Sequence, residues 1–240
     1  MYETYDECRA RIFGATEEEK VGGGNAERHN AIINSDSGTL GVRVPVIKRL
    51  AKAVPIACRD AVLSGFFGSG DTVFETVLFA GVLAARKGDY RKTREYMKRL
   101  IPMFSSWAHP DTIVPCLRWT DEAAFRTDFS YLLDCEGQYE VRTYIIYLMT
   151  RCIESDLDFA LDTLINKVKY GQYYVDMAAA WCVAEALVKN YEGALPTIEK
   201  SVLPPFVHNK AIQKARESFR LTDERKAQLS SLRAKIKDKK

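Results

Sequence analysis

The strongest constraint on the fold of this chain is an almost unbroken succession of helical hydrophobic patterns, with hardly any strand pattern between them. From residue 71 onward, apolar side chains recur every three or four residues, which is the period of an amphipathic helix. Short breaks containing glycine and polar residues separate these segments. Helices are expected over residues 71–87, 89–104, 121–134, 139–153, 157–169, 174–190 and 209–220. The pattern therefore predicts an all-α protein.

The one alternating stretch, TLGVRVPV, is interrupted by Pro45, and helical spacing follows it at Val46, Leu50 and Val54. Two helices with their turns take roughly 35 residues, which is close to the repeat length of proteins built from helix pairs. We therefore predict an α-solenoid of stacked antiparallel helix pairs, whose concave face is the usual binding surface. No linker divides the sequence, so a single domain over residues 1–240 is expected.

The composition is that of an ordinary soluble protein, with 240 residues of which 47% are hydrophobic and 28% are charged. No apolar run is long enough to span a membrane, and the N-terminus is charged from its third residue, so neither a membrane segment nor a secretory signal is expected. The six cysteines lack C-x-x-C spacing, which favours reduced thiols and predicts neither a metal site nor a cofactor. A cytoplasmic monomer is the expectation.

Positive charge gathers at the C-terminal end. Residues 210–240 hold eleven Lys or Arg against four Asp or Glu, a net charge of +7, and the whole chain carries +3, which leaves −4 for the rest. Such asymmetry suggests a polyanionic partner such as nucleic acid. The alternative is a solvated basic tail, about residues 225–240, that frays at the end of the chain.

Three segments place polar or aromatic residues in unusual helical positions. SSWAHPD puts Trp107 and Asp111 one turn apart, and Pro110 requires that pair to lie in the first turn of a helix. Arg142 interrupts a mostly apolar helix and has no acid one turn away, and Trp181 follows three alanines. The plain alternatives are a capping Asp beside a core Trp, a structural ion pair for Arg142, and a core anchor for Trp181.

Together these segments resemble the DNA alkylation repair family, the HEAT-like-repeat DNA glycosylases. The resemblance runs from about residues 41–52 to 208–226 and depends on order and spacing rather than on one motif. Its clearest pieces are SSWAHPD (105–111), YEVR (139–142), YYVDMAAAW (173–181) and HNKAIQK (208–214). It implies a solenoid of HEAT-like helix pairs whose concave face binds duplex DNA, and removal of N3- or N7-alkylated purines that carry a positive charge.

The resemblance also implies a role for each member of the expected catalytic group. Asp111 would stabilise the deoxyribose oxocarbenium ion and position water, Trp107 and Trp181 would frame the nucleotide, and Arg142 would hold a backbone phosphate. The chemistry suits these residue types, because a carboxylate stabilises a developing sugar cation and indole faces attract cations. The lesion would be engaged through its backbone in an open cleft, without a deep base pocket.

Basic residues for gripping the DNA backbone are expected on the same face. The candidates are Arg43, Lys48, Arg49, Lys210 and Lys214, with His208 and Asn209 at the start of the last predicted helix, where amide groups can meet phosphate. Asn209 as a simple helix cap and Arg43 in an ion pair are the alternatives. The partner would be duplex DNA with alkylated bases, in the cytoplasm and on the nucleoid when bound. A solenoid that binds damaged or branched DNA without excision, or a protein-interaction scaffold, is the competing hypothesis for the whole chain.

Overall fold

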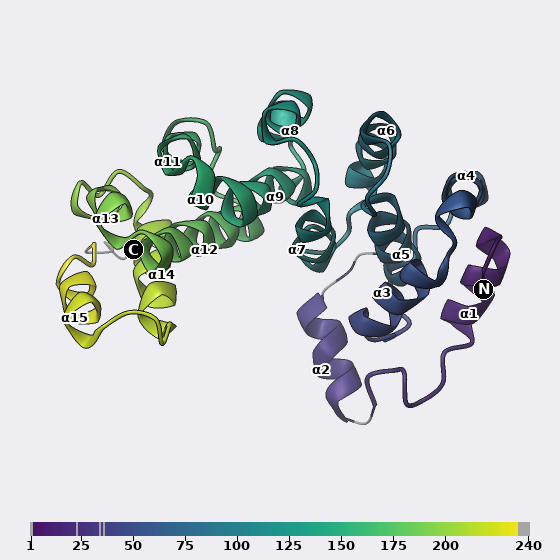
Figure 1. Ribbon diagram of the computed structural model, residues 1–240. Helices are drawn as coiled ribbons and strands as arrows, with labels where there is room; N and C mark the ends of the chain where they lie inside the picture. The colour runs from purple at the N-terminus through teal and green to yellow at the C-terminus, as the bar shows by residue number, and fades with distance from the viewer. Residues whose placement is uncertain (1, 23, 34, 36, 235–240) are drawn as a thin grey trace. The chain divides into compact units, whose positions relative to one another are not determined.

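The protein is all-α, as predicted. A computed structural model describes residues 2–22, 24–33, 35 and 37–234, and its regular structure is helical apart from one isolated bridge that pairs Lys20 with Val42 (Figure 1). No described helix is long and apolar enough to cross a bilayer.

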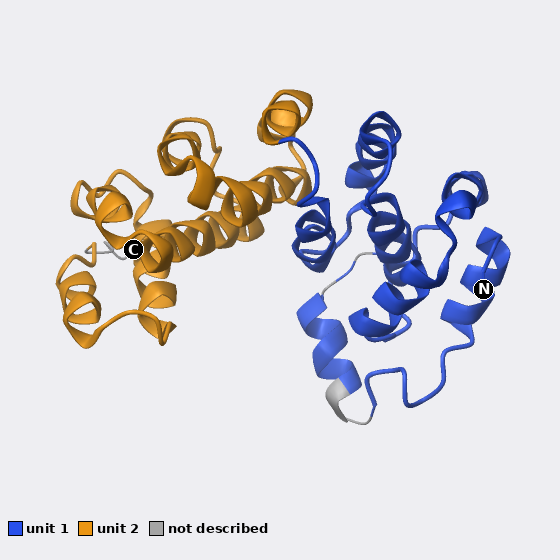
Figure 2. Cartoon of the chain, in the orientation of Figure 1, with its two compact units in different colours: residues 1–121 blue, residues 122–240 orange. Residues whose placement is uncertain are grey.

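The described chain divides into two compact units, residues 1–121 and 122–240 (Figure 2). Unit 1 contains α1 (Tyr5–Phe13), α2 (Gly24–Ile33), α3 (Val44–Ala53), α4 (Arg59–Ser69), α5 (Phe74–Ala84), α6 (Tyr90–Leu100) and α7 (Ala108–Ile113). Unit 2 contains α8 (Glu122–Phe129), α9 (Gln138–Tyr147), α10 (Ile153–Ser155), α11 (Leu157–Asn166), α12 (Tyr173–Lys189), α13 (Tyr191–Glu199), α14 (Pro205–Glu217) and α15 (Asp223–Ser231). The solenoid and the single domain stay predictions.

Helix α5 is the centre of unit 1. Its sequence, FETVLFAGVLA, is apolar on nearly every side, and a helix of this kind must be surrounded by protein. Every residue of α5 is buried, and the helix contacts α3, α4, α6 and α7. The α3 and α7 helices, which carry most of the candidate residues of this unit, are therefore both packed on one buried helix.

A buried carboxyl group on α5 fixes the segment that leads into α3. Glu75 is fully buried, and its Oε1 accepts hydrogen bonds from the Thr39 hydroxyl (2.7 Å) and the Val42 amide (3.1 Å). Its Oε2 accepts from the Leu40 amide at 3.0 Å. Satisfying three donors at once offsets the cost of burying this polar group, and it holds residues 39–42 against the core.

Glu75→Gln is expected to lower the free energy of unfolding by about 1–3 kcal/mol. A glutamine amide can accept from Thr39 and Val42, but its N–H group then faces the Leu40 amide, so one buried donor loses its partner. Chemical denaturation and amide hydrogen exchange at Leu40 measure the effect. The same change at exposed Glu95 on α6 is the control, and equal stability of the two variants would contradict this account.

Helix α12 is the centre of unit 2, where it contacts α9, α13 and α14 (Figure 1). Tyr173 at the start of α12 meets Phe206 at the start of α14, with ring centroids 6.4 Å apart. Further along, Trp181 of α12 and Lys214 of α14 line one hollow. The two helices therefore run in the same direction, and the intervening α13 returns the chain between them.

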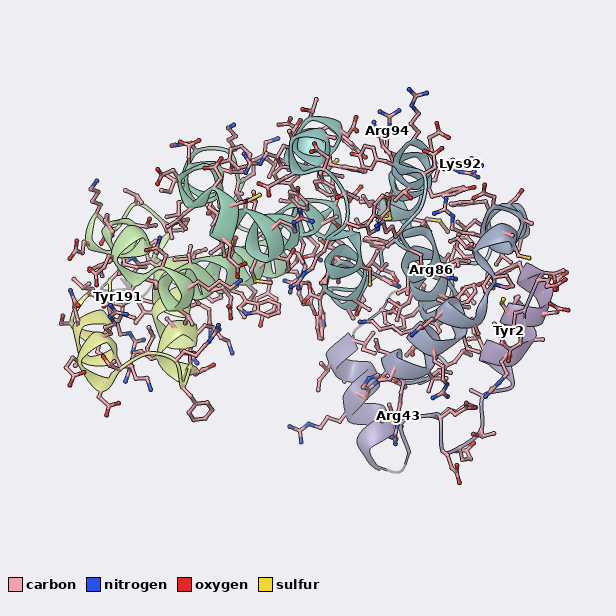
Figure 3. All side chains as sticks on the ribbon, in the orientation of Figure 1. Tyr2, Arg43, Arg86, Lys92, Arg94 and Tyr191 are labelled. Atoms are coloured by element: carbon pink, nitrogen blue, oxygen red, sulfur yellow. The ribbon has the colours of Figure 1, made fainter. Side chains whose placement is uncertain are left out.

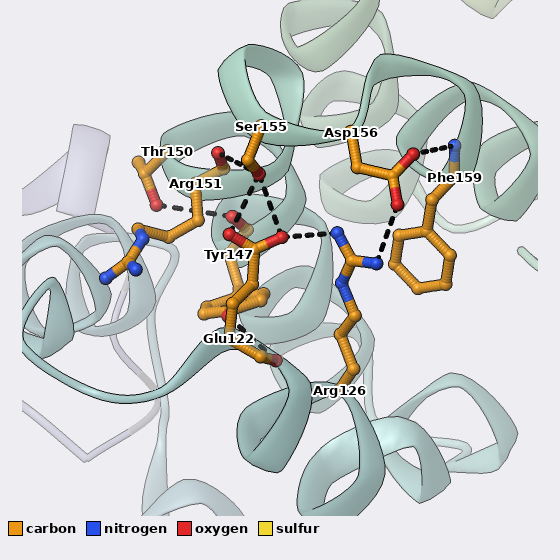
Figure 4. A network of polar contacts seen from close by, with 8 residues as sticks. All are labelled: Glu122, Arg126, Tyr147, Thr150, Arg151, Ser155, Asp156 and Phe159. Atoms are coloured by element: carbon orange, nitrogen blue, oxygen red, sulfur yellow. Dashed lines mark hydrogen bonds and ion pairs between the residues drawn. The ribbon is translucent and has the colours of Figure 1, made fainter.

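A network of charged side chains joins α8 to α10 and α11 (Figure 4). Arg126 contacts Glu122 one turn earlier and Asp156 at 2.8 Å, and its guanidinium group lies 3.9 Å from the centroid of the Phe159 ring. Asp156 also caps α11 by accepting from the Phe159 amide at 3.1 Å, and Ser155 donates to Glu122. Burial alone would lower the pKa of Arg126, but its hydrogen bond to Asp156 and its neighbouring groups raise the pKa, so the guanidinium stays charged.

Candidate nucleic-acid interface

The start of α7 has the geometry that the SSWAHPD segment predicts. Trp107 is the N-cap, and Pro110 is the third residue of the helix, where its missing N–H costs nothing. The Asp111 amide donates to the Trp107 carbonyl at 3.3 Å, so the two residues are one helical turn apart. Both side chains are partly exposed. The indole and the carboxylate can therefore face the same ligand.

The polar groups of the same segment close the C-terminal end of α2. The Trp107 Nε1–H donates to the Ile32 carbonyl at 2.8 Å, and the Ser106 hydroxyl donates to the Ile33 carbonyl at 2.6 Å. These are carbonyl groups that the last turn of a helix leaves without partners. Because the indole N–H is already engaged, Trp107 can offer a ligand only its ring, which is the part that attracts cations.

His109, between Trp107 and Asp111, was not singled out from the sequence, yet it anchors the motif in the core. The ring is fully buried between Phe74 and Phe104, at centroid distances of 4.5 and 5.3 Å. Its Nδ1 accepts from the Ser105 amide at 3.3 Å and its Nε2 lies 3.0 Å from the Phe74 carbonyl, a pattern that fits the neutral ring protonated on Nε2. Burial lowers the pKa of His109 to about 4, and the hydrogen bond to Phe74 opposes this only in part.

Arg142 on α9 is 5% exposed, and it reaches the start of α12. Its Nη1 donates to the Tyr174 carbonyl at 2.8 Å. The sequence of α9 shows no acidic partner for Arg142 one turn away, and this backbone carbonyl is one of the partners that the side chain has instead. Trp181 lies seven residues after Tyr174 on α12, which is two turns or about 10 Å along the same face.

Trp181 lines an open hollow between α12 and α14. The side chain is 38% exposed, which excludes a fully buried core anchor. The hollow has a volume of about 260 Å³, and Glu185, Lys214 and Glu217 lie around it. Lys214 pairs with Glu217 at 2.9 Å, and Arg220 pairs with Glu185 at 3.1 Å. One residue of the predicted catalytic group and one of the predicted DNA contacts therefore share this site.

Of the predicted catalytic group, the structure brings Trp107 and Asp111 within one helical turn of each other in unit 1. Arg142 and Trp181 both belong to unit 2, where Arg142 reaches the first turn of α12 and Trp181 lies two turns further along that helix. Assembly of the four residues into one cleft stays a prediction.

The basic residues predicted on α3 divide between two places in unit 1. Arg43 and Arg49 line a hollow together with Arg11 and Glu19, and Arg49 pairs with Glu19 at 3.2 Å. Lys48 is exposed, and its positive charge acts on Cys116. Burial raises the pKa of the Cys116 thiol, and Lys48 partly opposes that rise.

The predicted positions of His208 and Asn209 were wrong. Helix α14 begins at Pro205, so these residues are inside its first turns, and the His208 amide already donates to the Pro204 carbonyl at 2.9 Å. The fully buried His208 ring places Nε2 2.8 Å from the Leu232 carbonyl. Asn209 exchanges two hydrogen bonds of 2.9 Å with the backbone of Ala234. Both side chains hold the segment after α15, and we no longer assign them to DNA. Lys210 extends outward and contacts Gln213 at 2.9 Å.

Asn209→Ala is expected to release the segment after α15. The loss of two buried hydrogen bonds should lower the free energy of unfolding by about 2 kcal/mol and speed amide exchange at Ala234. Gln213→Ala removes a similar amide group from an exposed position one turn later, and it should leave Ala234 protected. Unchanged amide exchange at Ala234 in the Asn209 variant would contradict a role of Asn209 in holding this segment.

No family model, curated protein or solved structure matches this chain. The described residues also contain no group of three or more His, Cys, Asp or Glu arranged to hold a metal ion. The functional argument therefore depends on the residues and their geometry.

Proposed function

We propose that this chain is a monofunctional DNA glycosylase that removes cationic N3- or N7-alkylated purines from duplex DNA. The proposal rests above all on the start of α7, where Asp111 follows Trp107 by one turn and the indole N–H is already satisfied. This arrangement offers a carboxylate and an aromatic ring to a ligand that becomes cationic at the sugar. It is also the arrangement through which the sequence resembles the DNA alkylation repair family.

The reaction needs only water as co-reactant. The C1′–N glycosidic bond breaks, the bonding electrons leave with the purine, and the positively charged base departs as a neutral molecule. The sugar then carries oxocarbenium character, which the Asp111 carboxylate stabilises. Water adds at C1′ and loses a proton to Asp111 or to solvent, which leaves an abasic site. The leaving base needs no general acid because alkylation has already made it cationic.

Trp107 and Trp181 supply ring faces to the cationic nucleotide. Lys48, Lys210 and Lys214 supply positive charge for the phosphate backbone, and in this proposal Arg142 turns toward a phosphate beside the lesion. The α-solenoid, in which HEAT-like helix pairs place these residues on one concave face, is part of the same proposal. A monomer in the cytoplasm, on the nucleoid when bound, would suffice for this activity.

The direct test is release of N7-methylguanine from alkylated duplex DNA by the purified protein. Release should exceed spontaneous depurination and should follow enzyme concentration, and the same DNA incubated with heat-denatured protein gives the background. If the two samples release base at the same rate, the glycosylase assignment is wrong.

The alternative is a solenoid that binds damaged or branched DNA without removing bases. The observation in its favour is the burial of Arg142, because a side chain that is 5% exposed and bonded to the Tyr174 carbonyl must move before it meets a phosphate. Salt-dependent binding without base release would support this alternative. No DNA binding at moderate salt would instead favour a protein-interaction scaffold.

A further inference from the structure

Three arginines from two helices converge on one hollow in unit 1. The hollow has a volume of about 510 Å³, with Arg11 from the end of α1, Arg43 from the N-cap position just before α3 and Arg49 from α3 around it (Arg43 is labelled in Figure 3). Pro45 and Val46 supply apolar surface, and Thr16, Glu18 and Glu19 complete the lining. The sequence predicts Arg43 and Arg49 as DNA contacts, but it does not indicate Arg11 or Glu19.

Glu19 lies between Arg11 and Arg49, and its carboxylate neutralises part of their positive charge. One carboxylate oxygen contacts Arg11 and lies 3.2 Å from Arg49. The other oxygen accepts from the Thr16 amide and hydroxyl at 3.0 and 3.2 Å. The hydrogen bond from Arg11, followed by that from the Thr16 amide, lowers the pKa of Glu19 to about 2, so Glu19 is an anion at every physiological pH.

Arg43 and Arg49 retain hydrogen-bonding capacity toward the hollow. Arg43 uses its Nε to donate to the Lys20 carbonyl at 3.0 Å, and its two terminal nitrogens donate to no described residue. Arg49 contacts Glu19 through one terminal nitrogen only, and its side chain is 66% exposed. A guanidinium group holds five N–H donors in a planar fork that matches two oxygens of a phosphate group.

We propose that this hollow binds one backbone phosphodiester of duplex DNA through Arg43 and Arg49, with Glu19 acting as an internal anion that competes with the phosphate. The proposal rests on the proposed DNA binding. It adds a phosphate site and an internal carboxylate that lowers the affinity of this site. Glu19 fixes the orientation of Arg49, and it also places a negative charge where an anionic ligand must bind. The affinity of the site is therefore set below what the arginines alone would give.

Glu19→Gln is expected to tighten binding to undamaged duplex DNA by about fivefold, because it removes one like charge at contact distance from the phosphate. The logarithm of the binding constant should also fall more steeply with the logarithm of salt concentration, by up to about 0.9, because a newly available arginine displaces one more counterion. Glu17→Gln is the matched control, since it makes the same charge change in the same loop at an exposed residue outside the hollow.

Arg43→Ala and Arg49→Ala are expected to weaken binding and to reduce the same salt slope by about 0.9 each. These exposed positions keep the proposal testable if Glu19→Gln fails to fold, which circular dichroism would reveal. Arg91→Ala on α6 is the control for loss of one exposed arginine. The proposal is overturned if Glu19→Gln binds no tighter than Glu17→Gln, or if both arginine variants keep the salt slope of the Arg91 variant.

Two further measurements are needed. One distinguishes a DNA phosphate from a free phosphate ion as the ligand, and the other tests the hollow independently of glycosylase activity. Inorganic phosphate should compete with duplex DNA no better than sulfate does. Strong and selective competition by inorganic phosphate would assign the hollow to a free anion and overturn the DNA assignment. All binding is measured on undamaged duplex, so loss of affinity in the arginine variants supports the hollow even when no base is released from alkylated DNA.

Discussion

Asp111→Asn is expected to slow base release from alkylated duplex DNA by about a thousandfold. A carboxylate about 4 Å from the developing sugar cation stabilises it by roughly 4 kcal/mol at an effective dielectric of 20, and asparagine keeps the shape but loses the charge. Affinity for undamaged duplex should stay the same or increase, because the change removes a negative charge near a polyanion. Loss of rate without loss of affinity distinguishes a catalytic carboxylate from a positioning one.

Single-turnover release of N7-methylguanine, with enzyme in excess over DNA, measures this effect apart from product release. Glu95→Gln removes one negative charge from the same unit at an exposed position on α6, and it should keep the wild-type rate. Circular dichroism and duplex affinity show whether the Asp111 variant is folded. A folded Asp111 variant with a rate within about tenfold of wild type would remove Asp111 from the mechanism.

The stability of unit 1 is expected to fall by about 3 kcal/mol as the pH drops from about 6.5 to about 4 through the protonation of His109 alone. In the folded protein, burial between Phe74 and Phe104 lowers the pKa of the ring to about 4, whereas the unfolded chain keeps the ordinary value of 6.5. Between these values the unfolded state binds a proton that the folded state does not bind. Protonation therefore favours unfolding, and the stability is complete only above about pH 6.5.

His109→Gln isolates this contribution from those of the other two histidines. A glutamine amide can still donate to the Phe74 carbonyl but does not titrate, so the variant should be less stable near neutral pH and less sensitive to pH between 6.5 and 4. Denaturation of both proteins across this range gives the difference. If the variant does not fold, NMR titration of the wild-type ring gives its pKa directly. A ring that titrates near 6.5 in the folded protein would contradict the prediction.

Local sequence patterns predicted α3, α5, α6, α8, α9, α11, α12 and α14, but they did not predict α1, α2, α4 or α15. The apolar period placed α12 within one residue at each end, because its sequence stays helical up to Asn190. The same reasoning did not identify α13, which has Gly193 and Pro196 inside its nine residues. Helix α13 exists because Asn190 caps its first turn through the Gly193 amide and because α11 and α12 cover its apolar side. Such support from tertiary packing is not visible in a local pattern.

The candidate site was predictable where one helical turn determines it, and not where distant segments meet. Trp107 and Asp111 belong to one turn, so their spacing was enough. The Tyr174 partner of Arg142 and the Ala234 partner of Asn209 lie 32 and 25 residues away in sequence, and no spacing rule connects them. Glu19 was not predicted for the same reason, because its ion pairs are formed with arginines from two helices that are distant in sequence, α1 and α3.

The hydrogen bond between the Trp107 indole and the Ile32 carbonyl gives this side chain a structural role in addition to the proposed contact of its ring with the substrate. Replacement by alanine removes the aromatic surface and also one of the two hydrogen bonds that hold the end of α2, so a slow alanine variant would report both lost stacking and a weakened attachment of α2. Replacement by phenylalanine keeps an aromatic plane and removes only the N–H anchor. The ratio of the base-release rates of the phenylalanine and alanine variants, rather than either rate alone, measures how much the aromatic ring contributes to the reaction.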